Sequence, residues 1–335
     1  MNVDVIKPGV LSTLQDLGRV GFQRFGVPVC GVMDEWSHRI ANLLVGNPAH
    51  EATLEVTLMG PSLRFTEAAL IAITGASLSP RIGEHAVPQG TPVLVGAGSQ
   101  LDFGRRVAGM RAYLAVRGGF AVPPVMNSRS TYVRGAFGGF DGRALRKGDA
   151  LVIGASDVED TLMQLAAKLR AGTLPFATLD DPPELPPAPS GSLPTTVRVM
   201  AGQQWDAFTP QARQALCEAE FRLSPQSDRM GFRFEGPKLA LTEPLEMISE
   251  AVAFGTIQVP PDGNPIVLMA DRQTTGGYPK IASVASVDLP ILAQMTPQQA
   301  LRFTLISLED AQQLYLARER ALAGVAKQVE ALRRS

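Results

Sequence analysis

The sequence predicts a mainly β protein that is built from two tandem domains with few helices. Three observations lead to this prediction: short apolar runs end at turn residues, the same short motifs occur in the same order in both halves, and a Pro- and Ser-rich stretch at residues 181–192 lies between the halves. Together they indicate an internal duplication of a unit of short strands.

The strands are expected where β-branched and other apolar residues form runs of four to six between turn residues. Such runs occur at residues 70–74, 92–95, 111–116 and 150–153. Many short strands separated by close turns are typical of barrels and sandwiches.

Four segments of the first half have counterparts in the second half. The matched pairs are residues 3–6 with 197–200, 60–67 with 236–243, 87–94 with 259–268 and, more loosely, 145–153 with 295–303. Gly-Pro and Pro-x-Gly turns could produce any one match by chance, but four matches in one order favour duplication.

Helices are expected at residues 36–44, 160–171 and 209–217, and from residue 308 to near the C-terminus. The last one carries an imperfect apolar stripe, for which core packing is favoured over partner binding. The connector should be extended, because proline disfavours helix. We therefore predict a first domain at 1–160, a helix and linker at 161–195, a second domain at 196–312 and a C-terminal helix at 313–335.

Composition narrows the class of protein. The chain has 335 residues, of which 45% are hydrophobic, and its net charge is −1. This balance argues against nucleic acid or an anionic membrane as a partner. Two cysteines are too few for a disulfide framework, and neither a leader nor a spanning segment is visible. We expect a cytoplasmic protein.

The segment Asp271–Lys280 is the strongest candidate site in the sequence. It follows an apolar run and combines Arg272 and Lys280 with hydroxyl side chains and the glycine pair Gly276 and Gly277. Glycines let a backbone approach a ligand, and the cations can neutralise a carboxylate or a phosphate. The alternative is a tight turn in which the glycines supply positive φ angles. The segment is expected to be an exposed loop.

Several common chemistries leave no mark in the sequence. It contains neither a phosphate-binding P-loop nor a Gly-x-Ser-x-Gly elbow, and a Met-Lys biotin-attachment motif is missing. The three histidines, His38, His50 and His85, lack metal-ligand spacing and are expected at the surface or as capping residues.

Long motifs resemble the KipA-type biotin-dependent carboxyltransferase family over nearly the full length. They are residues 7–19, 26–34, 41–47, 128–131, 138–149, 227–231, 255–260 and 271–280. One departure is Asn127, where glycine is expected.

The resemblance implies a pair of cyclophilin-like β-barrel domains and several possible functions. Members include the C subunit of an ATP-dependent 5-oxoprolinase, allophanate hydrolase subunit 2-like proteins, the carboxyltransferase region of urea carboxylase, and a regulator that binds a KipI-like kinase inhibitor. This chain lacks biotin carboxylase and biotin-carrier parts and an amidase-type Ser-rich loop, which favours the 5-oxoprolinase component. The family then implies a KipI-like B subunit, a lactam-utilisation-type A subunit, and ATP with Mg²⁺ at the level of the complex.

In that function the enzyme would cleave 5-oxo-L-proline to L-glutamate after phosphorylation of the lactam amide. The catalytic candidates are Arg272, Lys280, Asp271 and Glu250, the two cations stabilising phosphoryl charge. Gln258 is expected to donate a hydrogen bond to the substrate. The other substrate-binding candidates are Asp228, Arg229, Gln273, Thr274, Thr275, Gly276, Gly277 and Tyr278, with Asp34, Ser128 and Arg129 as second-rank residues.

Asp228, Glu250 or Asp271 could hold Mg²⁺, or each could instead pair with a nearby arginine. A carboxyltransferase or allophanate hydrolase subunit 2-like role in urea or amide metabolism, and a non-catalytic regulator, remain alternatives.

Overall fold

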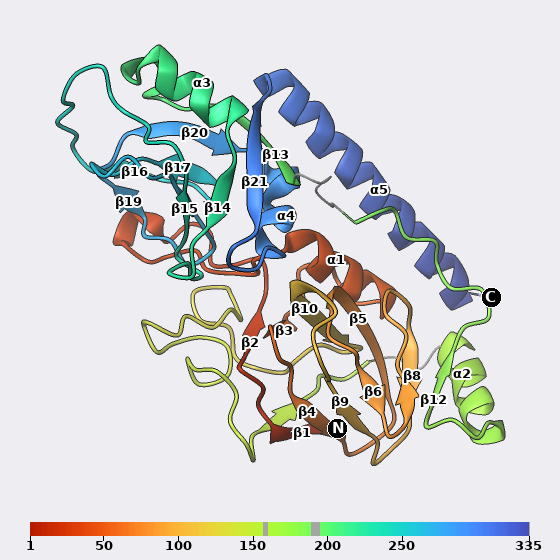
Figure 1. Ribbon diagram of the computed structural model, residues 1–335. Helices are drawn as coiled ribbons and strands as arrows, with labels where there is room; N and C mark the ends of the chain where they lie inside the picture. Colours follow the sequence, from red (N-terminus) through yellow and green to blue (C-terminus); the bar gives the residue numbers. More distant parts are fainter. Residues whose placement is uncertain (157–159, 189–194, 335) are drawn as a thin grey trace. The chain divides into compact units, whose positions relative to one another are not determined.

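The computed structural model describes residues 1–156, 160–188 and 195–334, and it is mainly β (Figure 1). Within these residues it has 21 strands and five α-helices. The prediction of a mainly β chain with few helices is confirmed. Part of the predicted connector, residues 189–192, lies outside the described residues.

Backbone contacts divide the chain into two units. Unit 1 comprises Met1–Gly18, Asp34–Pro186 and Arg320–Ser335, and unit 2 comprises Arg19–Met33 and Pro187–Glu319. This division differs from the predicted boundaries because distant segments pack together. Met33 belongs to the second hydrophobic core, and the Glu184 N–H donates to Gln328 Oε1 at 2.8 Å within unit 1.

Unit 1 holds two six-stranded sheets. One has the order β11-β1-β4-β9-β6-β7, with bounds Ala150–Val152, Asn2–Lys7, Ser62–Phe65, Gln100–Asp102, Arg81–Ile82 and His85–Ala86. The other has the order β12-β8-β5-β10-β3-β2, with bounds Phe176–Thr178, Val93–Val95, Ala69–Ser77, Ala108–Val116, Thr53–Thr57 and Leu11–Gln15. All four apolar runs that the sequence marks as strands lie in or across these elements.

The helix α1 (Glu35–Leu44) packs against β5 and β10 of the second sheet. Both strands are long buried runs because α1 covers one of their faces and the core of the unit covers the other. The core includes Leu54, Phe65, Ile71 and Leu114, each of which is fully buried.

The expectation that His38 lies at the surface is wrong. His38 is fully buried on α1, and its Nδ1 shares a hydrogen bond of 2.8 Å with Thr53 Oγ1. Burial lowers the pKa of His38 to about 4, against smaller raising effects of Asp16 and Glu55. A lone histidine gives no local signal of this environment, because Thr53 comes from a different element.

His38 should make unit 1 sensitive to mild acid. A pKa depressed from 6.5 to about 4 means that stability is complete above pH 6.5 and is lost as the pH falls towards 4. The change in pKa corresponds to a loss of about 3 kcal/mol. Urea unfolding at stepped pH, followed by Trp36 fluorescence in a Trp205→Phe background, measures it. His38→Gln should flatten the profile in that window, and an unchanged slope would contradict this origin.

Unit 2 contains a closed seven-stranded barrel of order β13-β20-β17-β18-β15-β14-β21 (Figure 1). The bounds are Thr195–Ala201, Lys280–Val284, Thr256–Gln258, Ile266–Leu268, Gly231–Glu235, Phe221–Leu223 and Ala300–Leu305. In its core the Phe303 ring contacts two other rings: Phe221 in a tilted arrangement, with centroids 5.7 Å apart, and Phe234 edge to face, with centroids 6.0 Å apart. A separate two-stranded sheet joins β16 (Glu250–Ala251) to β19 (Thr275–Gly276).

The matched segments of the two halves include the first strand of each unit, β1 and β13. β1 pairs with β11 in antiparallel fashion, whereas β13 pairs with β21 in parallel. The loosest of the four sequence matches, residues 145–153 with 295–303, contains β11 and most of β21. β11 therefore runs antiparallel to the first strand of unit 1, whereas β21 runs parallel to the first strand of unit 2.

The predicted helices are found within a residue of their expected bounds. They are α1, α2 (Asp160–Ala171), α3 (Pro210–Glu218) and α5 (Leu308–Arg334), and the structure adds the short α4 (Leu289–Ala293). Three 3₁₀ turns occur at Gln23–Phe25, Trp205–Ala207 and Ser286–Asp288. On α5, Val325 and Val329 of the apolar stripe are buried, while Leu316 is half exposed. In the described part of the chain, none of the helices has both the length and the apolar character that a membrane span needs.

Candidate functional site

The predicted segment Asp271–Lys280 leads from β18 through β19 into β20 of unit 2. It follows a buried strand, as the sequence indicates, but it is only partly an exposed loop. Lys280 is the first residue of β20 and is 5% exposed, so the expectation of an exposed lysine is wrong.

Lys280 is held by Glu250 from the small sheet. Lys280 Nζ donates to Glu250 Oε2 at 2.5 Å. The lysine side chain is 7% exposed and the glutamate side chain is 48% exposed. A buried ammonium requires a paired charge, and Glu250 supplies it.

Gln258 lies directly beside Lys280 in the barrel, because the two residues are register partners across β17 and β20. Gln258 is buried, and its Nε2 donates to the Tyr278 carbonyl at 3.4 Å. We call Lys280, Glu250, Gln258 and Gly276 the Lys280 cluster.

Gly276 lets the chain pass close to the amide end of the Gln258 side chain, which a larger residue would have to push aside. A Cβ at position 276 would lie 2.3 Å from Gln258 Nε2, a distance that real Cβ atoms essentially never show. Neither Gly276 nor Gly277 has a positive φ. Gly276 therefore serves close approach, whereas a Cβ at position 277 would meet only Ser249 Oγ at 3.4 Å, an ordinary contact. The tight left-handed turn that was the alternative is not formed by either glycine.

Asp271 is bound to Arg229, and the two side chains form a buried fork. Arg229 Nε donates to Asp271 Oδ2 at 2.9 Å, and Nη2 donates to Oδ1 at 3.0 Å. The same Nη2 donates to the Gly31 carbonyl at 2.5 Å, and the Asp271 N–H donates to the Arg229 carbonyl at 2.8 Å. This pair fixes the start of the candidate segment, which is a positioning role.

The Cys30 thiol lies in the same surroundings. Burial raises its pKa to about 12, and the nearby charge of Asp271 adds to the rise. The thiol is therefore protonated at neutral pH and is not an activated nucleophile.

Arg272 is the second cation of the segment. Its guanidinium lies 5.6 Å from the Phe254 ring centroid and makes long hydrogen bonds, 3.4 and 3.5 Å, to the carbonyls of Met269 and Ala270. Burial lowers its pKa, and its Nε is buried without a hydrogen-bond partner in the described protein. Such weak local partners leave the guanidinium suited to an anionic ligand.

A cavity of about 760 Å³ opens beside the end of the segment. Its wall comes from residues 238–245, 259–263 and 277–279. Tyr278 is 44% exposed at this wall, and its carbonyl is the one that holds Gln258. Gln273 and Thr275 are exposed and Thr274 is half-buried on the same segment. The stretch Gly277–Pro279, which lies between Gly276 and Lys280 of the cluster, thus forms part of the cavity wall.

The three carboxylates that were expected as Mg²⁺ ligands do not converge. Asp271 is held by Arg229 and Glu250 by Lys280, while Asp228 accepts the N–H groups of Met230 and Gly231 in a local turn. Within the described residues, no group of three or more His, Cys, Asp or Glu side chains could hold a metal ion. Asp228, Glu250 and Asp271 therefore do not form a dedicated metal site.

The second-rank residues of unit 1 form a clasp around Asp16. Ser128 Oγ and Ser130 Oγ each donate to Asp16 Oδ1 at 2.6 Å, and the Arg129 N–H donates to Oδ2 at 2.5 Å. Burial alone would raise the pKa of Asp16, but these hydrogen bonds lower it below its usual value. Asn127 precedes the clasp with a φ of 60°, a left-handed conformation that asparagine tolerates in place of glycine.

Asp34 is the N-cap of α1. Its Oδ1 accepts the Ser37 N–H at 2.9 Å and its Oδ2 accepts the Ser37 hydroxyl at 2.7 Å. Arg129 makes an ion pair with Glu51 at 3.2 Å. These contacts give Asp34, Ser128 and Arg129 structural roles.

Sequence reasoning missed Asp16 and the buried pair of Tyr113 and Glu55. Tyr113 Oη donates to Glu55 Oε2 at 2.8 Å, and both residues are almost fully buried. Only Asp16 had a local signal, since its Oδ1 accepts the Gly18 N–H as in an Asx turn. The other partners of Asp16, which are Ser128 and Ser130, lie far away in the sequence, and Tyr113 is likewise remote from Glu55.

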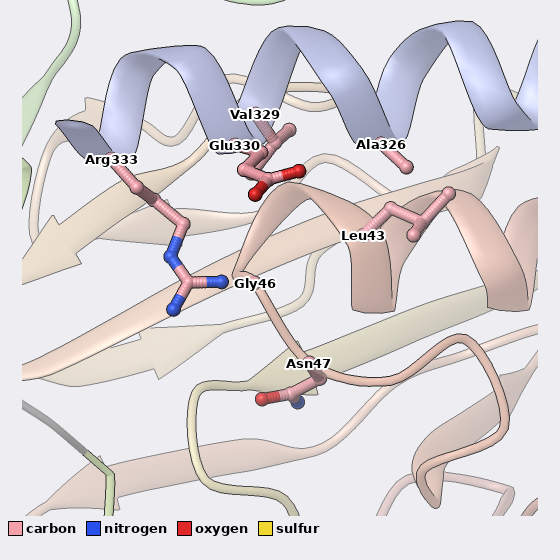
Figure 2. A pocket seen from close by; sticks show the side chains of 7 residues that line it. All are labelled: Leu43, Gly46, Asn47, Ala326, Val329, Glu330 and Arg333. Carbon is pink, nitrogen blue, oxygen red and sulfur yellow. The ribbon is translucent and has the colours of Figure 1, made fainter. Parts of the chain in front are cut away.

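A second hollow, of about 430 Å³, lies in unit 1 between α1 and the end of α5 (Figure 2). It is lined by Leu43, Gly46 and Asn47 on one side and by Ala326, Val329, Glu330 and Arg333 of α5 on the other. None of the predicted site residues lines it. The cavity of unit 2, beside the Lys280 cluster, is therefore the better candidate site.

Residues 25–305 match the family model described as carboxyltransferase domain, subdomain A and B. The chain is 37% identical to the C subunit of 5-oxoprolinase from Haemophilus influenzae, over 93% of this chain and 94% of that protein. It is 38% identical to the Escherichia coli protein of the same name, over 92% of both chains. It is also 31% identical to the urea amidolyase of Lachancea kluyveri, of which it covers 18%.

Solved structures give the same picture. The structure of the K. lactis urea amidolyase resembles this one with a TM-score of 0.83 and 29% identity, over 97% of this chain and 20% of that chain. The Kluyveromyces lactis urea carboxylase gives the same TM-score and identity, and the chain covers 29% of it. In both cases the likeness concerns one part of a much longer protein.

Proposed function

Because this chain belongs to the carboxyltransferase domain, subdomain A and B, family, we propose that it is the C subunit of an ATP-dependent 5-oxoprolinase. The observation that carries the proposal is the identity of 37–38% to two proteins named as the C subunit of 5-oxoprolinase, over more than nine-tenths of each chain. The urea enzymes, in contrast, are matched over less than a third of their length.

The Lys280 cluster supports this reaction chemically. In the proposed reaction the γ-phosphoryl group of ATP moves to the lactam amide oxygen and ADP leaves. Water then opens the activated ring on a partner protein, giving glutamate and inorganic phosphate. Negative charge collects on the transferring group, and a preorganised cation in a dry site stabilises it.

Individual residues take the following proposed roles. Lys280 faces the developing charge from the barrel wall, and Arg272 binds an anionic group of the substrate or nucleotide. Gln258 donates a hydrogen bond to the substrate. Tyr278, which lines the cavity, orients the substrate together with Gln273, Thr274 and Thr275 of the same segment. Asp228, Glu250 and Asp271 take no metal-binding role in this proposal, because each is held by a different partner.

The proposed partners are a KipI-like B subunit and a lactam-utilisation-type A subunit, in the cytoplasm. The test is 5-oxoproline-dependent ATP hydrolysis and glutamate release by the three proteins, with each omitted in turn. Loss of both products when this chain alone is missing supports the proposal. A stable complex that hydrolyses no ATP with 5-oxoproline contradicts it and favours a regulatory role.

A second candidate function is carboxyl transfer to a urea-type amide. The TM-score of 0.83 to the urea carboxylase structure favours it. Because the sequence contains no Met-Lys biotin-attachment motif, a separate protein would have to carry the biotin. In the same mixture, ATP hydrolysis that depends on bicarbonate and a biotinylated carrier protein, and not on 5-oxoproline, would select this alternative.

A further inference from the structure

The Lys280 ion pair is asymmetric in burial. The lysine side chain is 7% exposed, whereas the side chain of Glu250 is 48% exposed. The ammonium therefore depends on a partner, while the carboxylate does not, because water can solvate it equally well.

The two residues also sit on elements of different strength. Lys280 belongs to β20, which pairs with β13 on one side and β17 on the other. Glu250 belongs to the two-residue strand β16, which is joined to β19 through only two register pairs. The residues before it, 242–249, are exposed except for the half-buried Met247. Displacing Glu250 thus leaves the barrel ladder intact.

We propose that Glu250 is an internal stand-in for the carboxylate of an anionic amide substrate, which displaces it from Lys280. The exchange replaces one carboxylate by another, so the buried ammonium keeps an anionic partner. Its three N–H donors let it also face the charge that develops on the lactam oxygen in the proposed reaction. The released Glu250 gains water. The inference rests on the proposed function for the ligand, and it makes Lys280 and Glu250 the residues that select a lactam with a carboxylate over a neutral lactam.

A purely structural ion pair would behave differently. If Glu250 only tied β16 to β20, its removal would loosen the segment near Gly276 and weaken the binding of any ligand there. If Glu250 competes with the substrate, its removal strengthens binding, and only for ligands that carry a carboxylate. The sign of the change therefore separates the two roles.

The experiment is calorimetric titration of the full chain with 5-oxoproline and with 2-pyrrolidinone, the same lactam without the carboxylate. Glu250→Gln should bind 5-oxoproline about tenfold more tightly, which corresponds to about 1.4 kcal/mol, and should leave 2-pyrrolidinone binding unchanged. Glu246→Gln, at an exposed position on the same segment, is the matched control and should bind as wild type. Lys280→Met should lose the preference for 5-oxoproline over 2-pyrrolidinone.

Unchanged or weaker 5-oxoproline binding by Glu250→Gln overturns the inference, as does equal tightening for both ligands or the absence of binding by every variant. The titration requires no turnover. If the titration gives the expected result but the three-protein complex does not hydrolyse ATP, the proposed reaction is wrong and the inference about Glu250 stands.

Discussion

Replacing Lys280 with methionine is expected to lower 5-oxoproline-dependent turnover by about 100-fold or more. Of the two charged groups in the Lys280 cluster, the ammonium is the buried one, and the barrel strand β20 holds it in place. Its removal takes away a fixed positive charge where the proposed reaction develops negative charge. The measurement is glutamate release by the three-protein mixture at saturating ATP.

The variant should fold, because methionine keeps most of the length of the lysine stem and the half-exposed Glu250 can turn to water. The melting temperature checks this. Arg222→Met, which removes an exposed cation from β14 of the same unit, is the matched control and should keep nearly full activity. Turnover of a folded Lys280→Met protein within threefold of wild type would remove Lys280 from the mechanism.

The four strand runs and four helices that the sequence predicts were accessible because each depends on a local pattern. The runs around residues 70–74 and 111–116 are buried on both faces, so they are mainly apolar. The helix at residues 36–44 was likewise predicted from its local pattern. None of these inferences needs knowledge of which segments meet.

The candidate site was located by its polar composition, but its geometry depended on distant partners. Lys280 was expected in a loop because a dense polar run precedes it, yet the chain re-enters the barrel at that residue. Its register partner Gln258 and its ion-pair partner Glu250 lie 22 and 30 positions earlier. Nothing near Asp271 indicates Arg229, and nothing near Asp16 indicates Ser128.

Breaking the fork between Arg229 and Asp271 is expected to give the largest loss of stability in unit 2. The two side chains are 10% and 9% exposed, so Arg229→Ala leaves a buried carboxylate without its cation. Removing one partner of such a pair costs about 3–5 kcal/mol. Unfolding in urea, followed by Trp205 fluorescence in a Trp36→Phe background, reports on this unit.

The pair itself should contribute less than either single substitution suggests. Arg229→Met combined with Asp271→Leu removes both charges. The loss of unfolding free energy in this double variant should be smaller than the sum of the losses in the single variants Arg229→Met and Asp271→Leu by at least about 2 kcal/mol. It should still lose turnover, because the fork also anchors Gly31 and the start of the candidate segment. If the two single losses simply add, the two side chains act independently. If the double variant is fully active, the anchoring of residue 271 is not required for the proposed reaction.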